Sequence, residues 1–269
     1  MDKKTKIAAG VLILIGVLVL LYPTISNFLI QLNGSLAISS YDDAISELKQ
    51  EEVDKIITEA EQYNQQLGQM FDDSADQEGY GCLDVNDDGV MGYINIPKIH
   101  VNLPIYYGTD DSSLQKGIGH MEGSSLPVGG SGTHAILTGH RGLPDSDLFS
   151  DLDQLKEGDQ FFINILGEIH AYQVDSMITV LPYEVSSLNI ENGKDYVTLV
   201  TCTPYAVNTH RLLVRGIRIQ YEEADRTRKE RNELVSAMLW FPKEIKIAVA
   251  ALGVIVFGCI IMSVLRRKK

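Results

Sequence analysis

Cysteine is scarce in this sequence. The 269 residues include three cysteines, Cys82, Cys202 and Cys259, which are too few and too widely spaced for a disulfide scaffold or a four-cysteine zinc site. Basic residues are also outnumbered, 23 against 36 acidic ones. The formal net charge of -13 excludes nucleic acid as a main partner, because phosphate binding requires a surplus of lysine and arginine. Each cysteine therefore needs an explanation of its own.

Long apolar runs are confined to the two ends of the chain. Residues 7–21 follow three lysines, and a weaker apolar pattern continues to about residue 30. Residues 247–265 are 19 uncharged residues, close to the ~20 that cross a bilayer as a helix, and four basic residues follow them. Basic flanks stay on the cytoplasmic side, so both termini are expected in the cytoplasm of a two-pass cell-membrane protein. We favour an uncleaved N-terminal anchor over a signal peptide, since no small-residue cleavage site follows the first run.

Between these runs, helical and strand-like patterns follow one another. Residues 36–70 repeat apolar positions at helical spacing without a proline, which predicts one or two amphipathic helices. Residues 72–89 are rich in Asp, Gly and Ser and indicate an acidic loop. From residue 91 to 220, short β-rich runs are interrupted by Gly, Pro and Asn. The chain is therefore predicted to be mainly β, with a closed barrel or sandwich of about eight strands, flanking helices and a transmembrane helix at each end.

These patterns divide the chain into five parts. The cytoplasmic end and N-terminal anchor take residues 1–30, the helical segment and acidic loop 31–90, the barrel 91–221, a charged juxtamembrane helix 222–246, and the C-terminal transmembrane helix with its basic tail 247–269. The barrel carries the residues suited to chemistry.

Cys202 is the residue best placed to act as a nucleophile. It ends a strongly β-forming run immediately before Thr203-Pro204, where a strand must stop. A free thiol has a pKa of about 8.5 and needs a cationic neighbour to react well at neutral pH. Arg211 begins the next β-forming run, so the two side chains share a rim if residues 203–210 connect antiparallel strands. The alternative is an ordinary buried cysteine and a surface arginine.

Of the six histidines, His140 is the preferred partner for this thiol. It follows the apolar run 135–138 and stands where a strand gives way to a loop. His210 competes because it adjoins Arg211, but neighbouring residues on a strand point to opposite faces. A cysteine nucleophile, a histidine acid and base, and an arginine oxyanion donor would form an acyl-transfer site.

The segment TLVTCTPYAVNTHRLLVRG (198–216) resembles the signature of sortases, the cysteine transpeptidases of Gram-positive surfaces. Residues 91–109 and 119–159, together with the second apolar run, resemble the class C, pilin-polymerising branch in particular. The resemblance covers essentially the whole chain and implies the sortase β-barrel. Substrate choice in such an enzyme lies in the shape of its groove, for which residues 176–195 are the candidate.

The resemblance also implies roles and a reaction. Cys202 would be the nucleophile, His140 the general acid and base, and Arg211 the residue that stabilises the oxyanion or the substrate. The thiol would cleave an LPXTG-type sorting signal at Thr–Gly, and a lysine amine of another pilin subunit would resolve the thioacyl enzyme. The implied partners are pilin subunits and the lipid bilayer, without a metal or organic cofactor. Two alternatives stay open: a housekeeping-type sortase that attaches proteins to peptidoglycan, and a catalytically idle pilus-assembly scaffold.

The acidic loop departs from the class C pattern. That branch usually carries an Asp-Pro-aromatic lid motif, and this chain has no proline between Pro23 and Pro97. Either the loop covers the site through other contacts or the enzyme is constitutively open. Cys82 in this loop is expected to be an exposed incidental thiol, and a reversible disulfide with Cys202 is the alternative.

The same loop contains part of a calcium-binding pattern. Asp84, Asn86 and Asp88 fit the start of an EF-hand loop. Asn95 stands where the bidentate glutamate belongs, so the expected structure is an acidic turn that enters the barrel.

Overall fold

The computed structural model describes residues 3–67, 79–142 and 147–221. Within these limits, Phe28–Tyr221 is one compact unit, and the helix residues up to Asn27 belong to another. The predicted juxtamembrane helix at 222–246 and the second membrane run at 247–265 lie outside the described residues.

The N-terminal helix α1 (Lys3–Glu47) contains the predicted membrane anchor. In the described part of the chain, Ile15–Glu47 is the one helix that is long and apolar enough to cross a bilayer, judged by length and composition. The sequence pattern placed the end of the anchor near residue 30, but the helix continues to Glu47. No proline lies between the end of the apolar run near residue 30 and the amphipathic pattern, and the helix continues through Gly34.

The last turns of α1 pack on the barrel through Tyr41. This side chain is fully buried, and its hydroxyl donates to the Met91 carbonyl at 2.8 Å and accepts the Leu166 N–H at 3.0 Å. One tyrosine thus joins the helix to two separate segments of the barrel, which satisfies buried backbone groups on both.

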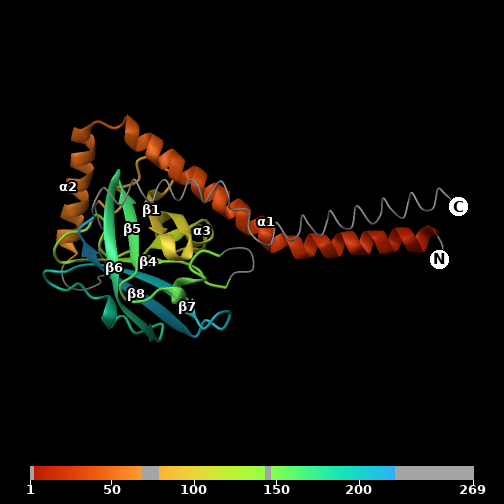
Figure 1. Cartoon of the computed structure of the whole chain (residues 1–269). Coiled ribbons are helices and arrows are strands. Elements are labelled where there is room, and N and C mark those ends of the chain that lie inside the picture. The colour runs from red at the N-terminus through yellow and green to blue at the C-terminus, as the bar shows by residue number, and fades with distance from the viewer. Residues whose placement is uncertain (1–2, 68–78, 143–146, 222–269) are drawn as a thin grey trace. The chain divides into compact units, whose positions relative to one another are not determined.

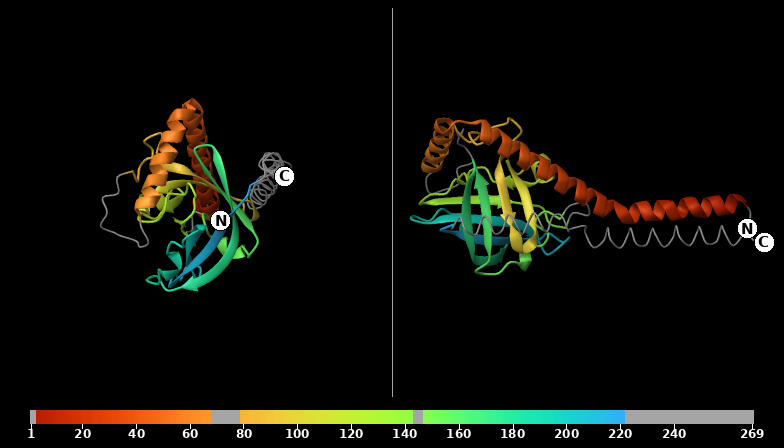
Figure 2. Two further views of the ribbon diagram at one scale, coloured as in Figure 1. Left: turned by 90° about the vertical axis from the view of Figure 1, so that its left-hand side faces the viewer. Right: turned by 45° about the horizontal axis from the view of Figure 1, so that its top comes forward.

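Helix α2 (Gln50–Gln66) follows directly and lies against the barrel (Figures 1 and 2). At its start the Glu52 carboxylate accepts the Lys49 N–H at 2.8 Å, which caps the helix. On its buried face the Asn64 amide accepts the Leu126 N–H at 2.7 Å and donates to the Leu126 carbonyl at 3.0 Å. The prediction of one or two helices in this region is therefore confirmed, and both the end of α1 and α2 contact the barrel through polar groups as well as apolar ones.

The barrel itself is closed and has eight strands in the described residues, as the sequence predicted. The strands are β1 (Val90–Ile96), β2 (Val101–Tyr107), β3 (Ile118–His120), β4 (Thr133–Thr138), β5 (Gln160–Ile165), β6 (Glu168–Val180), β7 (Asp195–Thr203) and β8 (His210–Ile219). Their order around the barrel is β1-β2-β3-β4-β7-β8-β6-β5. The pairs β2–β3 and β4–β7 are parallel, and the others are antiparallel. Closure gives each of these strands a neighbouring strand on both sides.

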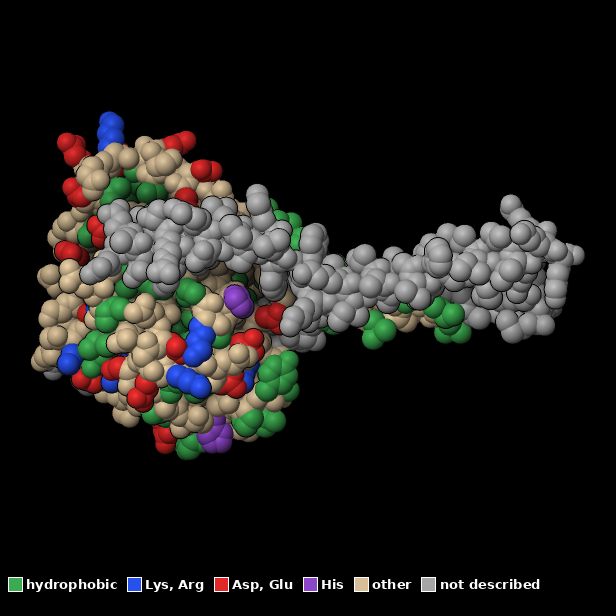
Figure 3. All heavy atoms as spheres, viewed as in Figure 1, with side chains coloured by type: hydrophobic (Ala, Val, Ile, Leu, Met, Phe, Trp, Pro, Cys, Tyr) green, Lys and Arg blue, Asp and Glu red, His purple; other side chains and the backbone are tan. Residues whose placement is uncertain are grey.

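Short helical turns occupy the connections: α3 (Asp111–Leu114) and the 3₁₀ turns η1 (Pro97–Ile99), η2 (Leu152–Gln154) and η3 (Ser186–Leu188). The Asp110 carboxylate caps α3 by accepting the N–H groups of Ser112 and Ser113. Acidic and basic side chains are interspersed over the barrel face seen in Figure 3. On the barrel surface, Lys98 and Asp159 form an ion pair at 2.6 Å.

Candidate functional site

Cys202 and Arg211 lie side by side at one end of the barrel. Strands β7 and β8 are antiparallel, and their register pairs Cys202 directly with Arg211. The connection between the strands is short and enters the left-handed backbone region at Ala206 and Asn208. The spacing in the sequence therefore predicted this neighbourhood correctly. Cys202 is half-buried and carries a free thiol.

His140 approaches from the end of β4, which runs parallel to β7. The register pairs Thr138 with Val200. It continues for one more residue, because the Gly139 N–H donates to the Val200 carbonyl at 3.0 Å. If the same register is extended by two residues from Thr138 and Val200, His140 falls level with Cys202. The strand order β4-β7-β8 thus brings a histidine and an arginine to opposite sides of the thiol.

The thiol faces outward from the barrel and away from its main core. Side chains alternate along β7, so Leu199 packs in the main core whereas Val200 belongs to a second, smaller apolar cluster. That cluster consists of Ile136, Leu188, Val200 and Leu213. We call this side of strands β4, β7, β8 and β6 the outer face. Cys202 stands at its rim, at the end of a strip of apolar side chains.

Arg211 has hydrogen-bonding capacity left over. Its Nη1 donates to the carbonyls of Asn208 and His210 at 3.2 and 3.1 Å. Among the described residues, no carboxylate lies within ion-pairing distance of it. A guanidinium has five N–H donors, so Nε and Nη2 remain for a bound oxygen atom. The arrangement can donate hydrogen bonds to an anion that forms next to the thiol.

His210, the competing histidine, lies in a different position. The register places it opposite Thr203, and its Nδ1 contacts the Thr209 hydroxyl at 2.9 Å. Alternation along β8 directs its side chain to the face opposite that of Arg211.

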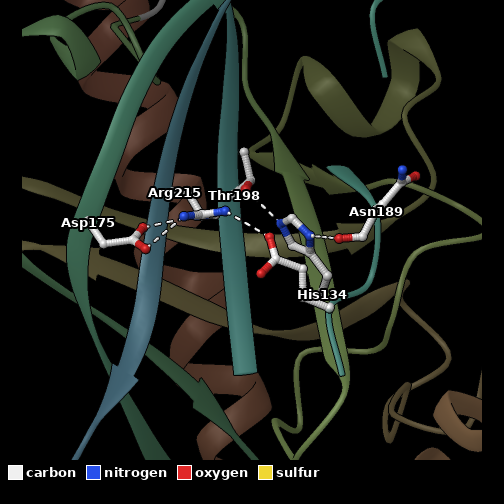
Figure 4. Close-up of polar contacts among 6 residues, drawn as sticks. His134, Asp175, Asn189, Thr198 and Arg215 are labelled. Atoms are coloured by element: carbon white, nitrogen blue, oxygen red, sulfur yellow. Dashed lines mark hydrogen bonds and ion pairs between the residues drawn. The ribbon is translucent and has the colours of Figure 1, made fainter. Parts of the chain in front are cut away.

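The connection between β6 and β7 packs on the outer face. Leu188 is buried in the second apolar cluster, and the next residue, Asn189, accepts a hydrogen bond at its carbonyl from Nδ1 of His134 at 2.9 Å (Figure 4). Burial lowers the pKa of His134. The segment 176–195, predicted to shape the groove, therefore includes the end of β6 and a connection that is anchored to β4.

Sequence reasoning did not single out His134, Thr198 or Arg215, which lie together on the outer face. A signal for two of them was present, since residues two and four apart on a strand share a face. Thr198 lies four residues before Cys202, and Arg215 lies four residues after Arg211. Counting along both strands from the reactive pair would have found them.

Tyr80 ties the acidic loop to the barrel. Its hydroxyl accepts the Gly108 N–H at 3.2 Å and contacts Nδ1 of the fully buried His120 at 3.1 Å. Because Nε2 of His120 faces the Ser125 carbonyl at 2.8 Å, Nε2 carries the proton and Tyr80 donates to Nδ1. Burial lowers the pKa of His120 to about 4. The loop after residue 79 is thus anchored to the barrel without the aromatic lid motif.

Cys82 is not the exposed thiol that the sequence suggested. It is half-buried and packs against the main core, because the neighbouring Leu83 is fully buried and donates its N–H to the Tyr107 hydroxyl at 2.8 Å. Burial raises the pKa of the Cys82 thiol to about 11, and Glu59 acts in the same direction. Both Cys82 and Cys202 are free in this structure.

The residues of the calcium-like pattern serve the loop's own backbone. The Asp84 carboxylate accepts the N–H groups of Asp88 at 3.1 Å and Gly89 at 2.9 Å, and the Asn86 amide donates to the Ser40 carbonyl at 3.1 Å. Across residues 3–67, 79–142 and 147–221, no group of three or more His, Cys, Asp or Glu side chains is placed to hold a metal ion. These contacts favour the acidic-turn interpretation.

Known proteins share this fold and sequence. The family model described as the sortase domain matches residues 94–219. Sortase C1 from Streptococcus agalactiae is 52% identical, covers 69% of this chain and 99% of its own, and superposes with a TM-score of 0.67. Clostridium perfringens sortase C, solved with the C-terminal cell wall sorting motif, is 46% identical over 70% of this chain and 100% of its own, with a TM-score of 0.63. Sortase A from Listeria monocytogenes is 29% identical over 91% of this chain and its own full length.

The barrel and these relatives define an enzyme of the cysteine transpeptidase class. The chain belongs to the sortase family, and the two solved structures just compared are class C sortases.

Proposed function

We propose that this sortase links pilin subunits covalently, with Cys202 as nucleophile, His140 as general acid and base, and Arg211 as the donor to the oxyanion or the substrate. The observation that carries the proposal is the strand register, which pairs Arg211 with Cys202. The proposed position of His140 is supported by its place two residues beyond Thr138, the last residue of β4, which pairs with Val200 of β7. The 52% identity to sortase C1 from Streptococcus agalactiae supports the class C assignment.

The first half of the reaction acylates the enzyme. The thiolate of Cys202 attacks the carbonyl carbon of threonine in an LPXTG-type sorting signal, and the carbonyl oxygen becomes an oxyanion. Nε and Nη2 of Arg211 donate to that oxygen, which stabilises charge that develops only in the transition state. His140 protonates the glycine nitrogen as the Thr–Gly bond breaks, so the leaving group departs as a neutral amine. The product is a thioester between threonine and Cys202.

The second half transfers the acyl group. A lysine amine of another pilin subunit attacks the thioester carbon, and His140 accepts the proton that this amine loses. The C–S bond breaks, an amide forms between threonine and lysine, and the thiolate of Cys202 returns. One histidine serves both halves because the second step is the reverse of the first with a different amine.

The membrane arrangement that we propose keeps the five parts predicted from the sequence: a cytoplasmic end and anchor at 1–30, a helical segment and loop at 31–90, the catalytic barrel at 91–221, a juxtamembrane helix at 222–246, and a second span with its basic tail at 247–269. The apolar N-terminal helix supports the first span. The barrel would then face the outside of the cell, where pilin subunits are displayed. Protease added to intact cells should remove the barrel and leave both termini protected.

The experiment that tests the function uses the full chain in detergent micelles, incubated with a pilin that carries an LPXTG-type signal. Intact mass spectrometry should show a thioacyl adduct, followed by a lysine-linked pilin dimer. Cys202→Ala should form neither product, whereas the matched control Cys82→Ala should form both.

Other outcomes separate the alternatives. An adduct that is resolved only by a peptidoglycan amine would identify a housekeeping-type sortase. A folded chain that forms no adduct with any sorting signal would identify a scaffold and would overturn the proposal.

A further inference from the structure

The outer face changes character with distance from Cys202. Next to the thiol it is apolar, with Val200 of β7 paired to Leu213 of β8. The next outward-facing pair is polar, Thr198 with Arg215. At this level the protein has a cavity of about 270 Å³, lined by Ser176, Ile178, Ser187, Glu191, Thr198, Leu213 and Arg215. We call it the distal pocket.

One side of the distal pocket is a fixed arginine. Nε and Nη2 of Arg215 donate to the two oxygens of the Asp175 carboxylate at 3.0 and 2.9 Å, and Nη1 faces Glu191 at 3.4 Å (Figure 4). The guanidinium also stacks on the Tyr196 ring, 4.2 Å from its centroid. These contacts hold Arg215 in place and leave its charge already neutralised, so the pocket is not built to bind an anion.

His134 holds the lining residue Thr198 in place. Its Nδ1 faces the Asn189 carbonyl at 2.9 Å, and since a carbonyl can only accept, Nδ1 carries the proton. Nε2 is therefore an acceptor, and the Thr198 hydroxyl donates to it at 2.7 Å. One neutral imidazole thus joins the floor strand β7 to the β6–β7 connection (Figure 4). The pocket is preformed, which reduces the ordering cost of binding.

The chemistry of the lining suits a basic side chain. Two carboxylates, Asp175 and Glu191, surround one guanidinium, so the local charge is negative. Glu191 is about half exposed, and a carboxylate can accept more hydrogen bonds than Arg215 and Tyr196 supply to it. The hydroxyls of the two lining serines can also accept. Ile178 and Leu213 provide apolar contacts for the methylene stem of a lysine or arginine side chain, whose charged end would then reach Glu191.

The distance from the nucleophile identifies which residue of a substrate could reach the pocket. Thr198 lies four residues from Cys202, which is about 13 Å along a strand. An extended or polyproline peptide advances by about 3.1–3.4 Å per residue. When the scissile threonine is at Cys202, the fourth residue before it is therefore at the level of the pocket. In an LPXTG-type signal, that is the residue immediately before the leucine.

We propose that the distal pocket is a subsite for a basic side chain on the residue that precedes the sorting pentapeptide, with Glu191 as its acceptor. The proposal rests on the proposed function, because it assumes that the acyl half of a sorting signal lies along the outer face. An acceptor lysine does not fit this pocket, since its amine has to reach the thioester carbon at Cys202.

The test uses three internally quenched peptides that share one LPXTG-type pentapeptide and carry lysine, alanine or glutamate before it. With the full chain in detergent micelles, kcat/KM should be highest for the lysine peptide and lowest for the glutamate peptide. We expect kcat/KM for the lysine peptide to be about fivefold higher than for the glutamate peptide, through a lower KM. A factor of this size corresponds to the free energy of a partly exposed ion pair. Glu191→Gln should reduce this ratio to near one. Glu157→Gln, an exposed glutamate of the η2–β5 connection, should keep the wild-type ratio.

Equal kcat/KM for the lysine and glutamate peptides would overturn the subsite, as would a ratio that survives in Glu191→Gln. Binding of the same peptides to Cys202→Ala, measured by fluorescence anisotropy, tests the pocket without turnover. Tighter binding of the lysine peptide, lost in the Cys202→Ala/Glu191→Gln double variant, supports the subsite even if pilin is not the natural substrate. If the wild type cleaves none of the peptides, the proposed function fails, whereas cleavage without discrimination overturns the subsite alone.

Discussion

The two ends of the outer face carry the same types of residue in opposite states. At the distal end, His134 has both ring nitrogens hydrogen-bonded and Arg215 is paired with Asp175 and Glu191. At the rim, the His140 ring makes no hydrogen bond within the described chain, and Arg211 bonds only to backbone carbonyls. Both histidines belong to one strand or its immediate end, and both arginines belong to β8.

This difference separates residues that hold the structure from residues that can act on a ligand. A side chain whose donors and acceptors are all engaged contributes to stability, and its removal leaves buried groups unsatisfied. A side chain with spare donors contributes little to stability but can bind a group that arrives later. His134 and Arg215 therefore act as rigid supports at the distal end, whereas Glu191 there and the rim residues keep hydrogen-bonding capacity for a ligand. A preorganised site requires such an arrangement.

The largest expected effect concerns the arginines of β8. Arg211→Ala should lower kcat for transpeptidation by about 10²–10³, because an oxyanion donor is lost, with little change in the free energy of unfolding. Arg218 lies near the far end of the same strand, where it contacts Tyr172 and His170 and is 3.9 Å from Asp195. Arg218→Ala should cost about 1–3 kcal/mol of stability and leave kcat within twofold.

Steady-state kinetics and urea unfolding of the two variants, each as the full chain in detergent, measure both quantities. If Arg211→Ala lowers the free energy of unfolding as much as Arg218→Ala does, Arg211 is held by structural contacts in the same way as Arg218. That result would contradict the difference between the rim and the distal end of the outer face.

The next effect is on the pH dependence of the free energy of unfolding. It arises from the buried His120, both of whose ring nitrogens are hydrogen-bonded. Its folded pKa of about 4 lies below the unfolded value of about 6.5, so the unfolded chain binds the proton more readily. The contribution of His120 to the free energy of unfolding is therefore complete above pH 6.5. It decreases as the pH drops toward 4, by up to about 3 kcal/mol. His170, whose pKa burial lowers to about 3, adds to the same slope. Urea unfolding followed by circular dichroism between pH 7.5 and 4.5 measures it.

His120→Gln removes one of these two titrations. The free energy of unfolding of that variant should depend less steeply on pH than that of the wild type, whatever its stability at pH 7.5. An unchanged slope would show that His120 does not titrate as its burial implies.

A third effect contrasts the two thiols. A pKa of about 11 for Cys82, against about 8.5 for a free thiol, reduces its thiolate fraction at pH 8 by at least about 100-fold. Iodoacetamide at pH 8 should therefore label Cys82 about 100-fold more slowly in the folded chain than in urea, while Cys202 is labelled in the folded state. Peptide mapping after timed quenching distinguishes the three cysteines, and Cys202→Ala serves as the control in which Cys202 does not compete for the reagent. Labelling of Cys82 at the same rate in both states would contradict its burial.

The reactive pair could be predicted from the sequence because it depends on a local structure. Cys202 and Arg211 are joined by one short connection between antiparallel strands, so their spacing along the chain is enough to place them together. The short β-rich runs separated by Gly, Pro and Asn likewise predicted the barrel. His140 required the further fact that β4 lies parallel to β7, which no local pattern contains.

The supporting contacts could not be predicted in this way because they join distant segments. His134 reaches residues 55 and 64 positions away, and Tyr80 contacts His120 across 40 positions. Such contacts depend on the order of strands around the barrel. Cys82 was placed wrongly for the same reason. The acidic composition of its loop indicates exposure, whereas its side chain packs against the main core next to the fully buried Leu83.

The smallest expected effect uses two threonines near Cys202. Thr138 of β4 lies on the outer face, and its buried hydroxyl has no hydrogen-bond partner among the described residues. The Thr201 hydroxyl, in contrast, donates to the Gly139 carbonyl at 2.7 Å. Thr138→Val should leave stability unchanged or raise it by up to about 1 kcal/mol, because it removes an unsatisfied group. Thr201→Val should lower it by about 1–2 kcal/mol. Urea unfolding distinguishes the two. A loss of stability in Thr138→Val would mean that this hydroxyl is hydrogen-bonded in solution. Thr138 would then belong with the fully hydrogen-bonded residues of the distal end, and the residues with spare hydrogen-bonding capacity would be confined to the immediate surroundings of Cys202.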